Sequence, residues 1–221
     1  MFMISIIVAI FSLVVGGIVS ASVNSKMKKY SLVQVSTGLT GREMAQRMLN
    51  DNGVFDVAIT AGVEGADHFD PRTNTISLSP SNYNRQSLTA AATACHEAGH
   101  ALQFAQSYAP LKVRSSLVPL VNLCSNLWPI VFIIGIFLQM VNLTYAAIAV
   151  YAITLIFQVV TLPVEFNASK RGLEYLKGIG LGGNELAKSK SLLSSCAMTY
   201  VVAALASALQ LLLLLLHTRQ E

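Results

Sequence analysis

The sequence predicts a mainly α-helical membrane protein, with about four transmembrane helices and a small α+β region outside the lipid. Of its 221 residues, 53% are hydrophobic and 12% are charged, whereas a soluble domain usually has about a quarter charged residues. Several apolar runs are long enough to cross a hydrocarbon core of about 30 Å, which takes about 20 residues in a helix. The only sizeable polar stretch, residues 25–116, separates the first run from the others.

The predicted membrane segments are four runs without ionisable acids or bases: residues 2–20, 117–139, 145–164 and 195–216. The first run could instead be a cleaved signal peptide, since the Ser-Ala-Ser at 20–22 resembles a cleavage site. We expect a retained anchor, because no positive charge precedes this run and lysines follow it at positions 26, 28 and 29.

Basic residues are distributed unevenly along the chain. Fourteen of the 15 Lys and Arg residues lie between the first and second segments or between the third and fourth. The connection around Met140–Thr144 has none, and Arg219 is the one exception. Positive residues favour the cytoplasmic side, so we expect the N-terminus outside and both basic connections in the cytoplasm. The net charge of +4 is then a topology signal, and it predicts no nucleic-acid site.

We expect five parts along the chain. They are a transmembrane anchor, a membrane-associated region, a transmembrane hairpin, a loop or helix and a C-terminal transmembrane helix, at residues 1–24, 25–116, 117–164, 165–194 and 195–221. Cysteines at 95, 124 and 196 are too widely spaced for a disulfide framework or a zinc knuckle, so they predict buried thiols.

The polar region predicts a helix followed by strands. Thr40-Gly-Arg-Glu43 has the pattern of a capping box that opens a helix, and Asn50-Asp-Asn-Gly53 ends it. Residues 54–60 alternate as a strand does. Residues 68–79 predict a hairpin with its turn at 70–73.

An Ala-rich stretch predicts a further helix from about Ser87 to Gln106, because Ala is the best helix former. This helix contains His96-Glu97-Ala98-Gly99-His100. Positions i and i+4 lie on one face of a helix, so both imidazoles can reach one metal ion, and Glu97 can contact its water. We therefore expect His96 and His100 to bind zinc and Glu97 to act as general base. Two incidental histidines on a core helix are the alternative.

Catalytic zinc takes a third protein ligand and keeps an open fourth position. Glu165 directly follows the third membrane segment, and two crossings bring it to the same side of the membrane as His96. An acid beside a membrane is unusual unless it is paired or functional. His68 and other acids remain alternatives, whereas His217 falls on the far side.

Three segments carry a family resemblance: HEAGHALQ, VTLPVEFNASKR and DHFDPRTNTISLS. Together they resemble the YugP-like neutral zinc metallopeptidases of bacteria, and more distantly the chain is similar to HtpX and the CAAX prenyl proteases. The resemblance implies a zincin-like catalytic region, a Zn²⁺ cofactor and Glu165 as third ligand, in an E-x-x-A-D motif. The chain departs from that motif at Ser169, where a hydroxyl cannot supply the charge of an Asp.

The sequence thus predicts a multi-pass zinc metalloendopeptidase of the gluzincin type in a bacterial cell membrane, with its active site on the cytoplasmic side. Its expected substrate is a protein or peptide in or near the lipid bilayer. His68 or Arg171 could donate a hydrogen bond to the oxyanion, and the hairpin could pair with an extended substrate. A catalytically idle zinc scaffold is the alternative function. A transporter is disfavoured, because the membrane segments contain almost no ionisable residues.

Overall fold

The computed structural model describes residues 2–218, so Arg219, the basic residue at odds with the predicted topology, lies outside the described residues. The prediction of a mainly α-helical membrane protein is confirmed. Four helices are long and apolar enough to cross a membrane: α1 (Phe2–Tyr30), α5 (Ala109–Phe137), α6 (Val141–Gly178) and α7 (Gly183–Thr218).

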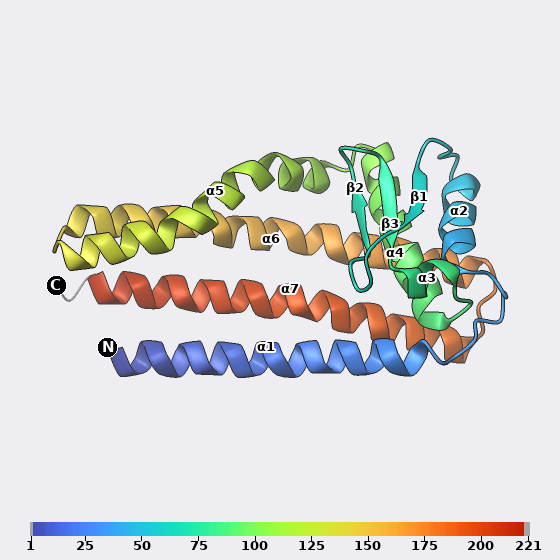
Figure 1. The fold of residues 1–221 in the computed structure, drawn as a ribbon, viewed down its shortest axis with the longest axis horizontal. Helices are drawn as coiled ribbons and strands as arrows, with labels where there is room; N and C mark the ends of the chain where they lie inside the picture. Colours follow the sequence, from blue (N-terminus) through green and yellow to red (C-terminus); the bar gives the residue numbers. More distant parts are fainter. Residues whose placement is uncertain (1, 219–221) are drawn as a thin grey trace.

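The long helices lie side by side, and a compact α+β region covers one end of them (Figure 1). The start of α1 and the end of α7 lie at the opposite end of the molecule (Figure 1). Helix α5 contains Pro119 and Pro129, and its first half diverges from α6 before the two helices come together (Figure 1). Proline in a helix interior removes a backbone hydrogen bond and favours such a bend.

Helices α6 and α7 extend well beyond the lengths expected from hydropathy. Most of the expected loop or helix at residues 165–194 is helical, and only the turn at 179–182 separates α6 from α7. The extensions persist because they pack against the α+β region, where Leu176 and Leu192 are fully buried. Glu165 therefore lies within a helix that continues for more than three further turns.

The α+β region contains three more helices and three strands: α2 (Gly41–Asp51), β1 (Ala58–Ala61), β2 (His68–Asp70), β3 (Thr75–Leu78), α3 (Pro80–Asn84) and α4 (Leu88–Ala105). The predicted capping box is present at Thr40, whose side chain accepts from Glu43 N while the Glu43 carboxylate accepts from Thr40 N. The strand expected at 54–60 begins later, at Ala58, and α3 was not predicted.

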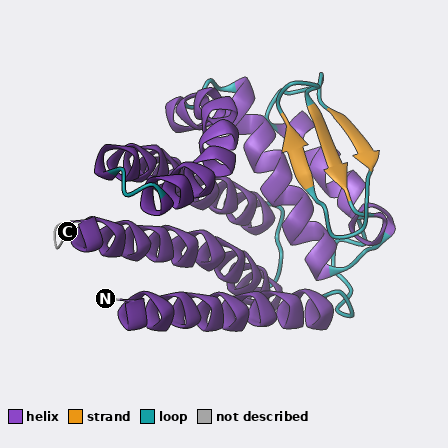
Figure 2. Cartoon of the chain, turned by 60° about the vertical axis from the view of Figure 1, so that its left-hand side comes forward, coloured by secondary structure: helices purple, strands orange, loops and turns teal. Residues whose placement is uncertain are grey.

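The three strands form one sheet in the order β1-β3-β2 (Figure 2). The predicted hairpin is confirmed, since β2 and β3 are antiparallel with Phe69 opposite Ile76. Strand β1 runs parallel to β3 on the other side and sets Ile59 beside Ile76. Strand β2 is therefore an edge strand, and it packs near α4, with the Phe69 ring 5.8 Å from that of Phe104.

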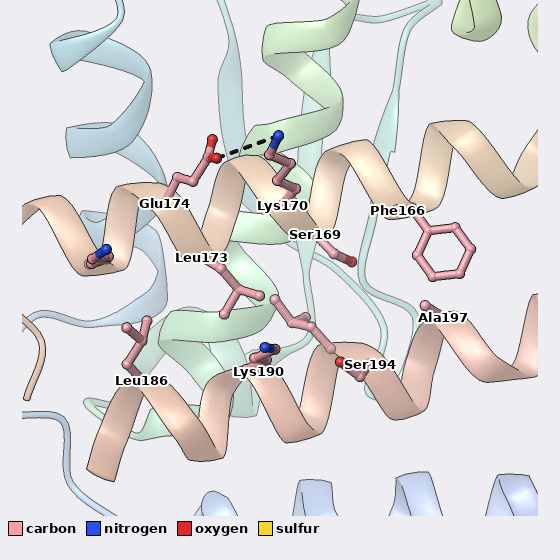
Figure 3. A pocket seen from close by; sticks show the side chains of 11 residues that line it. Phe166, Ser169, Lys170, Leu173, Glu174, Leu186, Lys190, Ser194 and Ala197 are labelled. Atoms are coloured by element: carbon pink, nitrogen blue, oxygen red, sulfur yellow. Dashed lines mark ion pairs between the residues drawn. The ribbon is translucent and has the colours of Figure 1, made fainter. Parts of the chain in front are cut away.

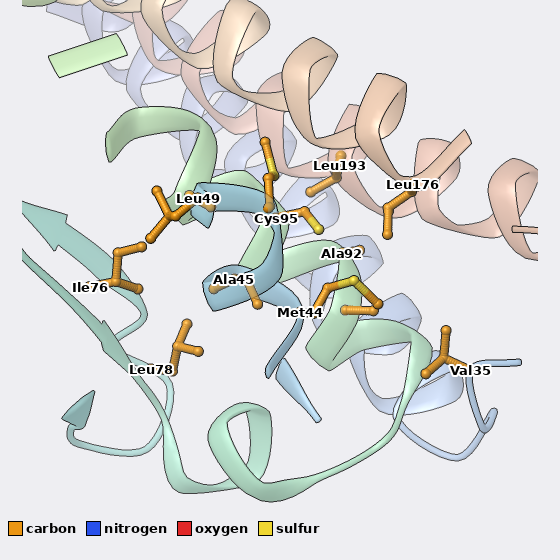
Figure 4. Packing of buried hydrophobic residues seen from close by; sticks show 14 of the residues in the cluster. Val35, Met44, Ala45, Leu49, Ile76, Leu78, Ala92, Cys95, Leu176 and Leu193 are labelled. Atoms are coloured by element: carbon orange, nitrogen blue, oxygen red, sulfur yellow. The ribbon is translucent and has the colours of Figure 1, made fainter. Parts of the chain in front are cut away.

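Helix α4 lies at the centre of the α+β region, between α2, the sheet and the ends of α6 and α7. Six of its seven alanines are fully buried, at positions 90, 91, 92, 94, 98 and 101. Larger side chains from the surrounding elements close around it, among them Leu49, Ile76 and Leu176 (Figure 4). Because alanine is small, neighbours can approach this helix from every side. The three cysteines are free thiols; Cys95 and Cys124 are buried, as predicted, whereas Cys196 is only partly buried.

Candidate metal centre and active site

The candidate site depends on a close crossing of α4 over α6. A Cβ atom added to Gly99 would lie 2.6 Å from the carbonyl oxygen of Ala168, and one added to Gly172 would lie 3.1 Å from the backbone of Cys95. Glycine at these positions therefore lets the two backbones touch. The pairing of residues 99 with 168 and 95 with 172 aligns one face of α4 with one face of α6.

This crossing brings His96, His100 and Glu165 together. Their ligand atoms all lie within 4.8 Å of one another. Glu165 Oε2 is 3.4 Å from Nε2 of His96 and 3.6 Å from Nε2 of His100. Ligand atoms about 2.0–2.1 Å from a tetrahedral zinc ion lie about 3.4 Å apart, so two nitrogens and one carboxylate oxygen at these separations fit that metal.

The other ring nitrogen of each histidine has its own partner. Nδ1 of His96 lies 3.1 Å from Oγ of Ser169, and Nδ1 of His100 lies 3.0 Å from Oε1 of Gln103. When Nδ1–H donates to such an oxygen, Nε2 carries the lone pair that a metal needs. Ser169, the residue at which the sequence departs from the E-x-x-A-D motif, thus gives His96 a neutral acceptor.

Gln103 is a site residue that sequence reasoning missed. It is fully buried, and its amide nitrogen donates to the carbonyl oxygen of Val164 and to Oδ1 of Asn167. A single side chain therefore orients His100 and joins α4 to α6. The only signal in the sequence was its position three residues after His100, on the same helical face.

Arg171 belongs to the same network. Its guanidinium donates to Oδ1 of Asn167 at 2.7 Å and to Oε1 of Gln106 at 2.6 Å. These contacts link α6 to the end of α4. The expected hydrogen bond from Arg171 to an oxyanion stays a prediction.

Arg114 contributes a charge that the sequence did not single out. Its Nη1 lies 3.7 Å from Oε1 of Glu165, whereas the histidines face the other oxygen, Oε2. Arg114 comes from the first turns of α5, so three helices meet at this carboxylate. The ion pair holds one oxygen of Glu165 and leaves the other facing both imidazoles.

Glu97 lies beside this cluster on α4 and is almost completely buried. Burial raises the pKa of its carboxyl to about 7, and the charge of Glu165 acts in the same direction, while that of His96 opposes them. Within residues 2–218, the Glu97 carboxylate has no hydrogen-bond partner. It is therefore free to exchange a proton with a molecule in the site.

The alternative third ligand, His68, is not part of this cluster. It is exposed on β2, and its Nδ1 lies 2.9 Å from the carbonyl oxygen of Ala66. The side chain of His217 is outside those that the structure describes.

Fold and site together define a multi-pass membrane protein with a His-His-Glu constellation suited to zinc. The chain belongs to the family described as "Putative neutral zinc metallopeptidase", whose model matches residues 4–219. It is 40% identical over 205 residues to "Putative membrane protease YugP" of Bacillus subtilis (strain 168), covering 90% of this chain and 91% of that protein. No solved structure matches significantly. The family resemblance predicted from the sequence is confirmed, and the family implies Zn²⁺ as cofactor.

Proposed function

We propose that this chain is a membrane-embedded, zinc-dependent endopeptidase of the gluzincin type. The observation that carries the proposal is the convergence of His96 and His100 from α4 with Glu165 from α6 on one point. Glu97, which is buried beside them, is the proposed general base. A purely structural metal site needs no such carboxylate.

Zinc bound between these three residues supplies Lewis acidity, which lowers the pKa of water and polarises a peptide carbonyl. The Glu97 carboxylate accepts the proton of the attacking water and passes it to the leaving amine nitrogen. Arg114 and Ser169 keep Glu165 and His96 in their orientations while this proton moves.

The edge strand β2 is the proposed docking site for the substrate backbone. It begins at His68, and the charges of His68 and Asp67 are close enough to act on the Glu97 carboxyl. An extended peptide can add to such an edge through main-chain hydrogen bonds. Because the site adjoins the bundle of long helices (Figure 1), the proposed substrates are membrane or membrane-proximal proteins.

The proposed location is a bacterial cell membrane, with the site facing the cytoplasm. The two regions that carry fourteen of the 15 basic residues, 21–116 and 165–194, contain α4 and the end of α6, where the site lies. Positive residues near membrane helices favour the cytoplasmic side.

The test measures zinc content and peptide cleavage separately in the purified, detergent-solubilised chain. We expect about one zinc per chain, and its loss in His96→Ala, His100→Ala and Glu165→Ala. Glu97→Gln should retain zinc and lose cleavage of a casein-like substrate by about 10²–10⁴-fold. Glu174→Gln is the matched control, because Glu174 is exposed on the same helix as Glu165 and, among the described residues, its carboxylate pairs with Lys170 alone.

Two results would contradict the proposal. Cleavage by Glu97→Gln at the wild-type rate would remove Glu97 from the mechanism. Zinc binding without any detectable cleavage by the wild-type chain, over a panel of soluble and membrane substrates, would favour the idle zinc scaffold.

A further inference from the structure

A groove of about 340 Å³ lies between α6 and α7, apart from the metal ligands (Figure 3). Its wall is mostly apolar, formed by side chains that include Phe166, Leu173, Leu186, Leu193 and Ala197. Figure 3 shows Leu173 of α6 and Leu186 of α7 in the space between the two helices. The groove touches the active site only through Ser169, whose Oγ contacts His96.

The two ends of the groove differ in character. Lys177 and Leu186 line one end, Phe166 and Ala197 line the other, and Lys190 lies between the ends near Leu173 (Figure 3). Phe166 and Lys177 are eleven positions apart on α6, which is about 16 Å along a helix. The apolar end adjoins the charge-free runs of both helices, at 145–164 and 195–216. The groove therefore runs from the basic connection toward the hydrocarbon region.

The charges along the groove favour an anion. Lys170 is 3.8 Å from Glu174, so that lysine has a partner within the groove. In the part of the chain that the structure describes, Lys177 and Lys190 are exposed and make no ion pair or side-chain hydrogen bond. Three lysines and one glutamate leave a local excess of positive charge beside an apolar wall.

We propose that this groove binds an anionic phospholipid, with its phosphate at Lys177 and Lys190 and an acyl chain along Leu173, Leu193 and Phe166. Basic pockets between membrane helices recognise lipid headgroups in this way. A lipid fits better than a peptide for two reasons. The apolar end adjoins the charge-free runs of α6 and α7, and both walls of the groove are helices, which offer no free strand edge for a peptide backbone. The bound lipid holds α6 against α7 next to Ser169, the groove residue whose Oγ contacts His96.

The experiment is native mass spectrometry of the full chain in detergent, with dioleoyl phosphatidylglycerol or dioleoyl phosphatidylcholine added at equal concentrations. We expect the wild type to retain phosphatidylglycerol preferentially. Lys177→Gln/Lys190→Gln should lower that preference by about tenfold. Lys28→Gln/Lys29→Gln is the matched control, because it removes the same charge from exposed positions at the end of α1.

A second variant, Ser194→Phe, places a large side chain in the groove without changing charge. It should reduce retention of both lipids, so the proposal stays testable if the double lysine variant folds poorly. Equal loss of preference in the α1 control would overturn the proposal, because it would indicate general charge attraction. Unchanged lipid retention with a raised KM for peptide cleavage in the groove variants would also overturn it, in favour of a substrate subsite. Lipid retention does not depend on Glu97 or on the metal ligands, so its failure is distinguishable from failure of the proposed peptidase activity.

Discussion

Helices α4 and α1 are both apolar and nearly uncharged over long stretches, yet they have opposite surroundings. Helix α4 is buried almost throughout, with six alanines fully excluded from solvent. Most of the apolar span of α1 is not buried in the protein, and large side chains such as Phe11 and Leu13 are 61% and 78% exposed. Hydropathy alone does not separate a helix surrounded by protein from one surrounded by lipid. Side-chain size distinguishes these two helices, because the small residues of α4 permit close approach by neighbouring helices.

The glycines of these helices show the same contrast. Gly99 of α4 lies against the backbone of Ala168, whereas a Cβ atom added to Gly17 of α1 would meet no other atom within 4 Å. One glycine is required by a contact between helices, and the other is not. The same substitution at the two positions therefore tests the comparison directly.

The largest expected effect is that of Gly99→Ala. The new methyl group would clash with the Ala168 carbonyl oxygen, so α4 must move away from α6. We expect a loss of about 3 kcal/mol in the free energy of unfolding, together with weaker zinc binding, because the ligands come from both helices. Gly17→Ala should be neutral or stabilising, since Ala is the better helix former by about 1 kcal/mol. Denaturant titration in detergent measures both. Equal effects at the two positions would contradict the tight crossing.

Gln103→Leu should have the next largest effect. It leaves Nδ1–H of His100 without its acceptor, and it removes the hydrogen bond that the Gln103 amide donates to the carbonyl oxygen of Val164. Unsatisfied buried groups cost about 1–3 kcal/mol, and loss of a partner to a metal-binding histidine lowers metal affinity about 10–100-fold. Zinc competition with a chelator measures the affinity. Gln46→Leu, which removes only a bond to Asn50 on α2, should leave zinc affinity unchanged.

Ser169→Ala should have a smaller effect on stability and a measurable one on zinc. The hydroxyl is the acceptor for Nδ1–H of His96, and we expect about tenfold weaker zinc binding with less than about 1.5 kcal/mol of lost stability. Ser116→Ala removes a hydroxyl that contacts only the Val113 carbonyl, and it is the control. If both variants bind zinc as the wild type does, Ser169 has no role in orienting His96.

The smallest effect is expected on the exposed face of α1. Leu13→Ala should change the free energy of unfolding by less than about 0.5 kcal/mol, because the Leu13 residue is 78% exposed. Leu49→Ala, at a fully buried position on α2, should cost about 2–5 kcal/mol. A comparable loss in Leu13→Ala would show that this face of α1 is covered in the folded protein.

Several features of the site followed from local sequence rules. The spacing of His96 and His100 places both imidazoles on one face of α4, because helical periodicity is fixed at 3.6 residues per turn. The capping box at Thr40 was correct for the same reason, since its contacts span three residues. The family and its zinc cofactor were also predicted, from three short segments taken together.

Other features required contacts between distant parts of the chain. The strand order β1-β3-β2, the length of α6 and the short helix α3 depend on what each segment packs against. Gln103, Ser169 and Arg114 carry no motif of their own, and their contacts to the site join residues from 3 to 73 positions apart along three helices.

The sequence by itself determined that this chain crosses a membrane with four apolar helices and that one polar-region helix carries two histidines and a glutamate in a zinc-binding pattern. The resemblance also pointed to Glu165, but only the tertiary structure places its carboxylate beside the two imidazoles and shows which residue holds it. The reason is physical: hydropathy and helical periodicity act over a few residues, whereas the meeting of Glu165 with His96 depends on how closely two backbones can cross at Gly99 and Gly172.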